Sequence, residues 1–211
     1  MEILYLDKID STQKYLTNLV REGKIDKEIA VVAKEQYSGV GSRNNSWIAK
    51  RGDLTFSFVI KQESLPKDLP ISSASIFFAF LMKEVLHEYD KNCWLKWPND
   101  IYIKNKKAGG VVTQLLKKFL IVGIGVNIAQ RDDDFANFEN IKSVKKVLNS
   151  YFMLLKNAQN WQETFSKYRI EFEKQKSFTV HIKGRKTTLE NAILCDDGAL
   201  LVNNERIYSL R

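Results

Sequence analysis

The sequence contains few cysteines, histidines and prolines. Among its 211 residues only two are cysteine, Cys93 and Cys195, and they stand far apart. Two isolated cysteines form neither a disulfide framework nor a redox or metal-binding spacing, so we interpret them as structural thiols. The two histidines are also far apart, which argues against a histidine-based metal site. We therefore assign no metal ligands in the chain.

Long apolar runs are missing as well. The longest apolar stretches, residues 76–82 and 119–128, are shorter than a membrane span, and glycines interrupt the second. Residues 1–7 mix acids with apolar residues and lack the basic and apolar regions of a secretory signal. These absences predict a cytoplasmic protein without membrane contact.

The composition is sufficient for a folded core. Hydrophobic residues make up 44% of the chain and aromatic residues 11%, which fits one domain, or one domain with a small appendage. The formal net charge is +8, and the lysines are dispersed over the whole sequence. The charge indicates either a solvated lysine-rich surface or an anionic partner such as a nucleic acid, ATP or an acidic protein domain.

Apolar periodicity predicts an alternation of strands and helices up to about residue 174. N-cap residues 10–12 precede a helix that Gly23 ends, and Ser72 or Ser73 caps a helix that runs to about residue 89. Residues 141–174 have a helical period and fit two helices, and residues 37–46 are predicted as a polar loop. The predicted strands cover 2–7, 29–33, 54–60, 94–97, 101–103, 111–116 and 119–128.

The period changes at residue 178. Strands are predicted at 179–182, 187–194, 199–202 and 206–210, and turn signals lie between the later ones. This spacing fits a small β-barrel. We therefore predict an α+β protein with a mixed β-sheet and flanking helices in residues 1–175, and a small C-terminal SH3-like β-barrel domain in residues 176–211.

The most informative segment is the run from Lys96 to Asp100, K-W-P-N-D, which is followed by K-K-A-G-G at 106–110. The proline makes a rigid, non-helical corner that presents Asp100. Residues 101–103 then form a short strand, and a hairpin would bring Lys107 back beside the corner. A carboxylate, an amide and a lysine would converge there next to bare glycine backbone, which suits chemistry on a carboxylate or phosphate. A plain β-hairpin with solvated lysines fits the spacing about as well.

Four blocks of the sequence, in order, resemble the motifs of biotin protein ligases. Residues 96–100 and 106–110 resemble the K-W-P-N-D and K-x-A-G motifs of that family. Residues 10–13 resemble D-S-T-N, residues 35–47 resemble E-x-Q-x-x-G-R-G-R with its tryptophan, and residues 123–127 resemble G-x-G-x-N. The resemblance implies a catalytic domain with an SH3-like barrel. It also implies formation of biotinyl-5′-AMP, followed by transfer of biotin to a lysine.

The resemblance implies catalytic roles for Lys107 and Asp100. The lysine would neutralise both the biotin carboxylate and the α-phosphate of ATP, which otherwise repel each other. The family spacing, seven residues after Asp100, selects Lys107 over Lys106. Asp100 would orient Lys107, and it could also help to deprotonate the acceptor lysine.

The same resemblance implies two sets of binding residues. The biotin-binding set is Ser11, Thr12, Gln36, Gly39, Lys107, Gly109, Gly110, Gly123 and Gly125. The ATP-binding set is Gly41, Arg43, Trp47, Lys96, Asn99, Lys107 and Asn127. Ser11 and Thr12 can serve as helix N-caps without any further role.

The loop at 39–47 departs from the family pattern. Val40, Ser42 and Asn45 stand where the family has arginines, and Arg43 is one position late. We interpret Arg43 as a substitute cation. The expected substrates are ATP and biotin with Mg²⁺, since phosphoryl oxygens under attack by an anion need shielding.

The expected partner is a biotin carboxyl carrier protein, an acetyl-CoA carboxylase subunit, or the domain of another biotin-dependent carboxylase. Many family members begin with a DNA-binding winged helix, but here the resemblance begins at residue 10, so we expect no sequence-specific DNA binding. A homodimer is left open. Two alternatives remain: a lipoate–protein ligase, and a non-enzymatic basic module that binds nucleic acid.

Overall fold

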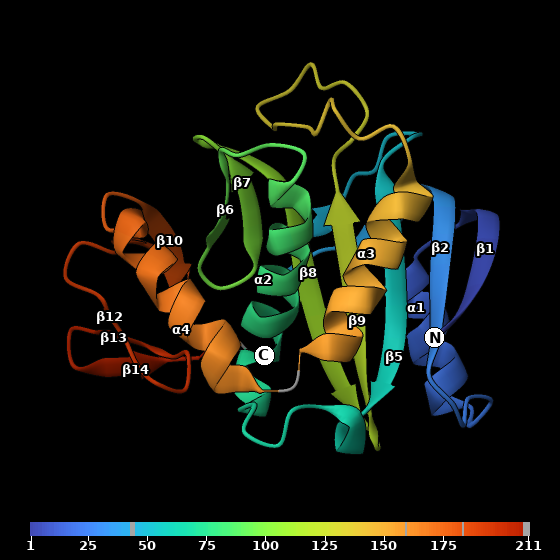
Figure 1. Ribbon diagram of the computed structural model, residues 1–211, viewed down its shortest axis with the longest axis horizontal. Helices are drawn as coiled ribbons and strands as arrows, with labels where there is room; N and C mark the ends of the chain where they lie inside the picture. Colours follow the sequence, from blue (N-terminus) through green and yellow to red (C-terminus); the bar gives the residue numbers. More distant parts are fainter. Residues whose placement is uncertain (43–44, 159, 183, 209–211) are drawn as a thin grey trace.

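A seven-stranded mixed sheet with the strand order β1-β2-β5-β9-β8-β7-β6 forms the centre of the computed structural model (Figure 1). The structure describes residues 1–42, 45–158, 160–182 and 184–208. β1 and β2 are parallel, and the remaining neighbours in this sheet are antiparallel. The strands are β1 (Glu2–Ile9), β2 (Ile29–Gln36), β5 (Leu54–Lys61), β6 (Cys93–Lys96), β7 (Asp100–Ile103), β8 (Lys106–Leu116) and β9 (Phe119–Val126).

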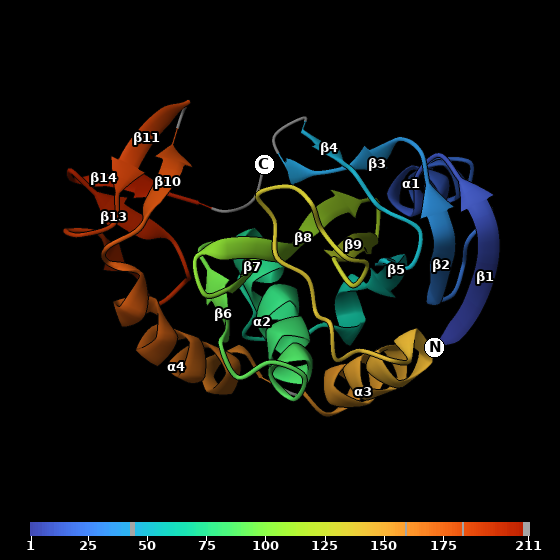
Figure 2. The same cartoon turned by 90° about the horizontal axis from the view of Figure 1, so that it is seen from above.

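Helices cover both faces of the sheet, as the sequence predicts. α1 (Thr12–Arg21) packs on one face, while α2 (Ala74–His87) and α3 (Val144–Asn157) pack on the other (Figure 2). Side chains of the central strands alternate between two cores, so Val59 faces α1 whereas Phe58 faces α2 and α3. Because both faces are covered, β9 is buried along its whole length. No helix in the described ranges is long and apolar enough to span a membrane.

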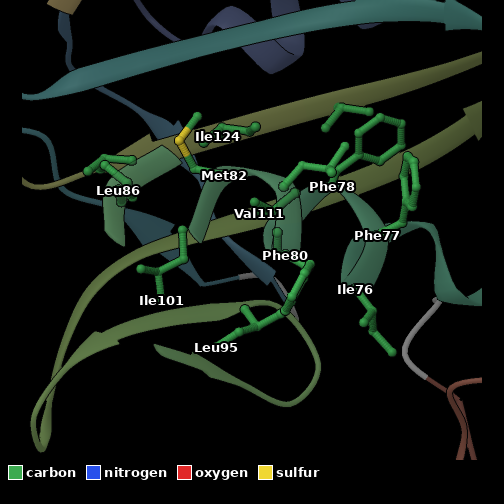
Figure 3. Close-up of a cluster of buried hydrophobic side chains, with 14 of the residues drawn as sticks. Ile76, Phe77, Phe78, Phe80, Met82, Leu86, Leu95, Ile101, Val111 and Ile124 are labelled. Atoms are coloured by element: carbon green, nitrogen blue, oxygen red, sulfur yellow. The ribbon is translucent and has the colours of Figure 1, made fainter. Parts of the chain in front are cut away.

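α2 is the centre of the larger core. It buries side chains on nearly all of its faces, because the sheet, α3 and α4 (Trp161–Phe172) surround it. Figure 3 shows its apolar side chains close to those of β6 to β9 in the sheet. Each fully buried side chain of this size contributes about 1.5–3 kcal/mol relative to exposure. The labelled residues are Ile76, Phe77, Phe78, Phe80, Met82 and Leu86 of α2, with Leu95, Ile101, Val111 and Ile124 of the sheet.

The C-terminal region is rich in strands but does not close into a barrel among the described residues. β10 and β11 form one two-stranded sheet, and β12, β13 and β14 form a three-stranded sheet. The predicted strand 187–194 is wrong as a single element, because Leu189 and Ala192 turn inward and are buried in a turn between β11 and β12. The division of the chain at residue 175 stays a prediction. The strands are β10 (Thr179–Ile182), β11 (Arg185–Thr188), β12 (Ile193–Leu194), β13 (Leu200–Val202) and β14 (Glu205–Ile207).

Two further differences from the predicted elements concern the site. The polar loop predicted at 37–46 contains a short antiparallel pair, β3 (Gly39–Val40) and β4 (Ser46–Trp47). β8 begins at Lys106, five residues earlier than predicted from its apolar pattern, because Lys106 to Gly110 already pair with β7. The lysine and glycine block therefore belongs to the sheet and shares its rigidity.

Candidate active site

Most of the predicted site residues lie on the face of the sheet that α1 covers, next to the N-terminal end of that helix. A cavity lies there between the start of α1, the end of β2, the β3–β4 segment and the strands β5, β7, β8 and β9. Its lining consists of Ser11, Thr12, Gln13, Gln36, Val40, Gly41, Ser42, Trp47, Phe56, Ser57, Asn99, Asp100, Lys107, Gly110, Val111, Val112, Gly123, Ile124 and Gly125. The two ends of this cavity differ in chemistry.

One part of the lining is polar, uncharged and buried. The Oε1 atom of Gln36 accepts hydrogen bonds from the backbone N–H of Thr12 (2.7 Å) and from its hydroxyl (3.0 Å). The Thr12 hydroxyl also lies 2.8 Å from that of Ser57. Ser11 caps α1, where its hydroxyl accepts from Lys14 N–H, and it lines the cavity at the same time. The structure therefore confirms Ser11 as the N-cap of α1, whereas Thr12 is the first residue of the helix and not a cap. Both residues line the cavity, and their role in binding biotin stays a prediction.

The other end of the cavity carries the Lys107–Asp100 ion pair. The register of β7 against β8 shifts between Ile101 and Tyr102, because Ala108 is an extra residue in β8. This bulge places Lys107 opposite Tyr102, on the same face of the sheet as Asp100. Without it Lys107 would point to the other face. The Lys107 Nζ atom lies 2.5 Å from Asp100 Oδ1, and both side chains are 27% exposed.

The K-W-P-N segment forms the rigid corner that the sequence predicts. Trp97 is buried, and its peptide bond to Pro98 is cis. Asn99 fixes the corner to β8, since its carbonyl accepts from Val111 N–H at 3.0 Å and its amide donates to the Val111 carbonyl. The backbone that presents Asp100 is therefore hydrogen-bonded on its β8 side.

A second cation, Lys96, stands close to the ion pair. Burial lowers the pKa of Lys96, and the neighbouring Lys107 lowers this pKa further, while Asp100 opposes the shift. The Lys96 ammonium donates to the Tyr102 hydroxyl at 3.3 Å and lies 5.0 Å from the centre of that ring. Burial raises the pKa of Tyr102 to about 12, and the charge of Asp100 adds to this effect. Tyr102 therefore stays a neutral hydroxyl at physiological pH.

Two glycines on β9 allow side chains to lie directly on the strand. A Cβ atom at Gly123 would come within 2.6 Å of Gln13 Oε1, and a Cβ atom at Gly125 would collide with the indole of Trp47. Gln13 Oε1 and Trp47 Nε1 are buried and have no hydrogen-bond partner among the described residues. The space that the sequence analysis assigned to ligand is thus shared with these two side chains, each of which has an unused polar atom.

Among the described residues, four of the predicted ones are not part of the cavity lining: Gly39, Lys96, Gly109 and Asn127. Gly39 and Gly109 lie in the strands beside it, and Arg43 is outside the described residues. Asn127 is buried, and its amide is used inside the protein: it donates to the Ala136 carbonyl at 3.0 Å and accepts from Arg131 at 2.6 Å. Asn127 thereby fixes the segment that follows β9.

The sequence analysis missed Ser57, Val112 and the apolar wall of the cavity. Ser57 is the clearest omission, because it lies in the middle of β5 between two phenylalanines and its hydroxyl faces the cavity. A small polar residue within an apolar strand is the signal that could have identified it. Gln13, the last residue of the block 10–13, is not among the predicted site residues, although it lines the cavity.

A wider cleft of about 820 Å³ continues from the ion pair toward the C-terminal strands. Its lining includes Lys96, Asp100, Lys107, Thr179 and His181. No group of three or more acidic, histidine or cysteine side chains suited to a metal ion occurs in the part of the chain that the structure describes. Asp100, the one carboxylate among the described lining residues, is already paired with a lysine.

Comparison with protein families places the chain in a known family. The model of the "Biotin/lipoate A/B protein ligase family" matches residues 5–128. A bifunctional ligase/repressor, BirA, of Escherichia coli is 31% identical over 136 residues, which cover 61% of this chain and 41% of that protein. A biotin–[acetyl-CoA-carboxylase] ligase of Paracoccus denitrificans is 26% identical over 117 residues and is covered to 45%. The chain thus matches less than half the length of these curated relatives.

Solved structures extend the likeness to nearly the whole chain. The biotin acetyl coenzyme A carboxylase synthetase of Helicobacter pylori, with bound biotinylated ATP, superimposes with a TM-score of 0.93 and 34% identity, over 98% of this chain and 99% of that one. A biotin protein ligase from Aquifex aeolicus, in complex with biotin and ATP, gives a TM-score of 0.78 at 26% identity, over 100% and 96% of the two chains. The predicted α+β fold class is therefore confirmed.

Proposed function

Because the chain belongs to the biotin/lipoate A/B protein ligase family, we propose that it activates biotin with ATP and transfers the biotinyl group to a lysine of an acceptor protein. In the first step a biotin carboxylate oxygen attacks the α-phosphorus of ATP, and pyrophosphate leaves. In the second step the neutral amine of the acceptor lysine attacks the acyl carbon of biotinyl-5′-AMP. AMP leaves, and the amine gives up one proton.

The observation that carries this proposal is the polarity of the cavity. Biotin has a ureido ring at one end, with two N–H donors and one carbonyl acceptor, and a carboxylate at the other. The buried hydroxyls of Ser11, Thr12 and Ser57 with the Gln36 amide suit the ureido ring. Lys107 suits the carboxylate. A ligand that is neutral and polar at one end and anionic at the other fits both.

The same polarity favours biotin over lipoate. The dithiolane ring of lipoate offers only weak sulfur acceptors, so it would leave the hydroxyl and amide groups of the buried end without partners. Leaving a buried polar group unpaired costs about 1–3 kcal/mol for each group. A site built to hydrogen-bond its substrate discriminates strongly against an analogue that lacks those groups.

Lys107 and Asp100 are the proposed catalytic pair. The Lys107 ammonium would stand between the biotin carboxylate and the α-phosphate, where it reduces their repulsion and stabilises the charge that develops during attack. Asp100, 2.5 Å away, would hold that ammonium in place. After pyrophosphate has left, the Asp100 carboxylate could also accept a proton from the incoming lysine.

The wider cleft is the proposed place for ATP. Lys96 and Asn99 line it beside Lys107, and Gly41 lines it from the β3–β4 segment. Trp47 would border the nucleotide from the narrower cavity, and Asn127 would support the site from behind through its bonds to the segment after β9. Mg²⁺ would arrive with the phosphates as part of the substrate, since Mg²⁺ at such sites keeps several waters and needs few protein ligands.

The proposed acceptor is the biotin carboxyl carrier domain of a carboxylase. The relatives, which include a biotin–[acetyl-CoA-carboxylase] ligase and a carboxylase synthetase, support this choice. The absence of sequence-specific DNA binding, the cytoplasmic location and the oligomeric state stay predictions.

One experiment tests the proposal against its alternatives. The protein is incubated with α-labelled ATP and Mg²⁺, with biotin in one reaction and lipoate in another, and the products are separated. We expect an acyl adenylate with biotin and none with lipoate. An adenylate with lipoate alone would assign the chain to the other branch of the family. Neither adenylate, together with salt-dependent nucleic-acid affinity, would identify a basic binding module.

A further inference from the structure

β6 is an edge strand of the main sheet, yet the backbone groups on its free side are not left open. Three of these backbone groups are hydrogen-bonded to two side chains. One side chain is on α4 and the other is on the short 3₁₀ turn after it, Glu173–Gln175. Leu95 N–H donates to Glu171 Oε2 at 3.3 Å, and Trp97 N–H donates to Gln175 Oε1 at 2.8 Å. The Gln175 amide in turn donates to the Leu95 carbonyl. Edge strands normally present such groups as an unpaired row.

The spacing of these two side chains explains how they replace a strand. Glu171 and Gln175 are four residues apart, so they project from the same side of a helical segment. A carboxylate can only accept, and it takes the N–H of Leu95. A primary amide can both donate and accept, and Gln175 uses this to span Leu95 and Trp97. Gln175 is fully buried.

The backbone that Gln175 holds leads directly into the catalytic corner. Trp97 is followed by Pro98, Asn99 and Asp100, and Asn99 binds β8. The corner is therefore held by β8 on one side and by Gln175 on the other. If the Gln175 amide were lost, two buried backbone groups would have no partner, at a cost of about 1–3 kcal/mol each. Displacement of the corner would relieve this cost.

We propose that Gln175 is a positioning residue for the Asp100–Lys107 pair. Its side-chain amide acts as a substitute strand partner that fixes the approach of β6 to the corner. The effect on catalysis rests on the proposed biotin-activating function, whereas the effect on the backbone does not. The residue itself lies outside both the cavity and the cleft linings.

The test compares Gln175→Met with Trp161→Phe. Methionine keeps the length of the side chain but removes both hydrogen bonds. Trp161→Phe removes a buried hydrogen bond of the same C-terminal packing, from the indole N–H to the Asp196 carbonyl (3.2 Å), and leaves both side-chain hydrogen bonds of Gln175 in place. Three quantities are measured well below the unfolding temperature of each variant: the biotin dissociation constant by calorimetry, the single-turnover rate of adenylate formation, and hydrogen exchange by mass spectrometry.

We expect Gln175→Met to slow adenylate formation by about tenfold to a hundredfold, because small misplacements of catalytic groups have effects of this size. Its biotin affinity should stay within about twofold of the parent, since the buried polar end is held by other contacts. Peptides covering residues 95–103 should exchange faster. Trp161→Phe should match the parent in rate, affinity and exchange over these residues.

Three results would overturn the inference. They are an unchanged exchange rate over 95–103 in folded Gln175→Met, a parental rate of adenylate formation in that variant, and equal losses in both variants. If the parent makes no adenylate, the proposed function fails, and the exchange measurement still decides whether Gln175 holds the corner. Should Gln175→Met not fold, Gln175→Glu serves instead. It keeps the acceptor for Trp97 N–H and loses the bond to the Leu95 carbonyl, so faster exchange over 95–103 is again expected.

Discussion

The two ends of the cavity are built in different ways. The uncharged end lies over the central strands β5 and β9 beside α1, and its hydroxyl and amide groups bind one another within that core. The charged end lies on the outer strands β6, β7 and β8. Its ion pair depends on a bulge in β8, on Asn99, and on side chains from the end of α4 and the 3₁₀ turn that follows it. The uncharged end is held by contacts among its own lining residues, whereas the charged end also depends on residues outside the lining.

This difference separates binding from chemistry. A pocket for a small neutral ring needs fixed donors and acceptors, and a buried, mutually bonded cluster supplies them. A lysine that stands between two anions must also be reached by ATP and then by an acceptor protein, so it must lie where the sheet is accessible. The outer strands are less enclosed than the central ones, so we expect mutations of distant supporting residues to lower the rate of adenylate formation before they weaken biotin affinity.

Replacement of Lys107 should give the largest effect and would sharpen the contrast between the ends. We expect Lys107→Ala to slow adenylate formation by about two to three decades, because a positioned group that stabilises developing negative charge is lost. The fold should persist, since the side chain is partly exposed and bonds only Asp100 among the described residues. Rates of biotinyl-5′-AMP formation and far-ultraviolet circular dichroism provide the measurement.

Lys106→Ala is the matched control. Lys106 is the neighbouring, exposed lysine of the same strand and lines neither the cavity nor the cleft. It should retain a rate close to that of the parent. If Lys106→Ala slowed adenylate formation more than Lys107→Ala, Lys106 would be the functional lysine of β8. The Asp100–Lys107 pair would then not be the reactive end of the cavity.

The sequence predicts the charged end better than the uncharged one. The K-W-P-N-D run and the following lysine are close in sequence, so a short hairpin suffices to bring Asp100 and Lys107 together. The bulge at Ala108, which turns Lys107 to the correct face, leaves no comparable mark in the sequence. Periodicity alone does not decide whether Lys106 or Lys107 is the catalytic lysine, and the spacing of the resembling family selects Lys107.

The uncharged end combines residues that are distant along the chain. Gln36 and Ser57 reach Thr12 from strands that follow 24 and 45 residues later. The pairing of β2 with β5 that brings these two strands together is a tertiary fact, which local propensity cannot specify. Gln175 was overlooked for the same reason, because its partners Leu95 and Trp97 lie about 80 residues away.

The β3–β4 segment offers a way to strengthen the charged end. Val40, Gly41, Ser42 and Asn45 carry no charge, although they line the cleft in which the phosphates are proposed to lie. A charge-assisted hydrogen bond contributes about 1.5–3 kcal/mol, so Ser42→Arg should slow the release of biotinyl-5′-AMP by about tenfold or more. Release of labelled intermediate into an excess of unlabelled ligand measures this.

Ser46→Arg adds the same charge on the same segment but at an exposed position outside both linings. It should leave the release rate near that of the parent. Equal slowing by both variants would show that general positive charge retains the intermediate. No slowing by Ser42→Arg would place the phosphates elsewhere in the cleft.

A smaller effect is expected at the uncharged end. Ser57→Ala removes a hydroxyl that lines the cavity, and the loss of one neutral hydrogen bond should weaken biotin binding by about fivefold. Thr55→Val is the control, because Thr55 is two residues away in β5, is buried, and bonds the Ala33 carbonyl instead of the cavity. Calorimetry without ATP should show weaker binding in the first variant only. Equal affinities would mean that the ureido ring does not reach Ser57.

The smallest effect is expected from a change at the start of α4, the helix that ends beside the charged end of the cavity. The Asp68 carboxylate accepts hydrogen bonds from the backbone N–H groups of Trp161 (2.9 Å) and Gln162 (3.0 Å). Burial alone would raise the pKa of Asp68, but these two bonds outweigh it and hold the pKa below its ordinary value. The stabilisation is therefore present above the unfolded pKa, near 3.8, and is lost as the pH falls through the lower folded value.

Asp68→Asn should remove this pH-dependent stabilisation. Loss of a capping interaction at a helix start typically costs about 1 kcal/mol, so the variant should unfold about 2–4 °C earlier at pH 7. The difference from the parent should shrink as the pH falls below 4, because the protonated carboxyl resembles the amide. Asp26→Asn changes the same charge at an exposed position and should shift unfolding little at either pH. A difference between Asp68→Asn and the parent that persists undiminished into acid would show that the ionised carboxylate does not stabilise α4. Glu171 and Gln175 would then stabilise the charged end without a contribution from Asp68.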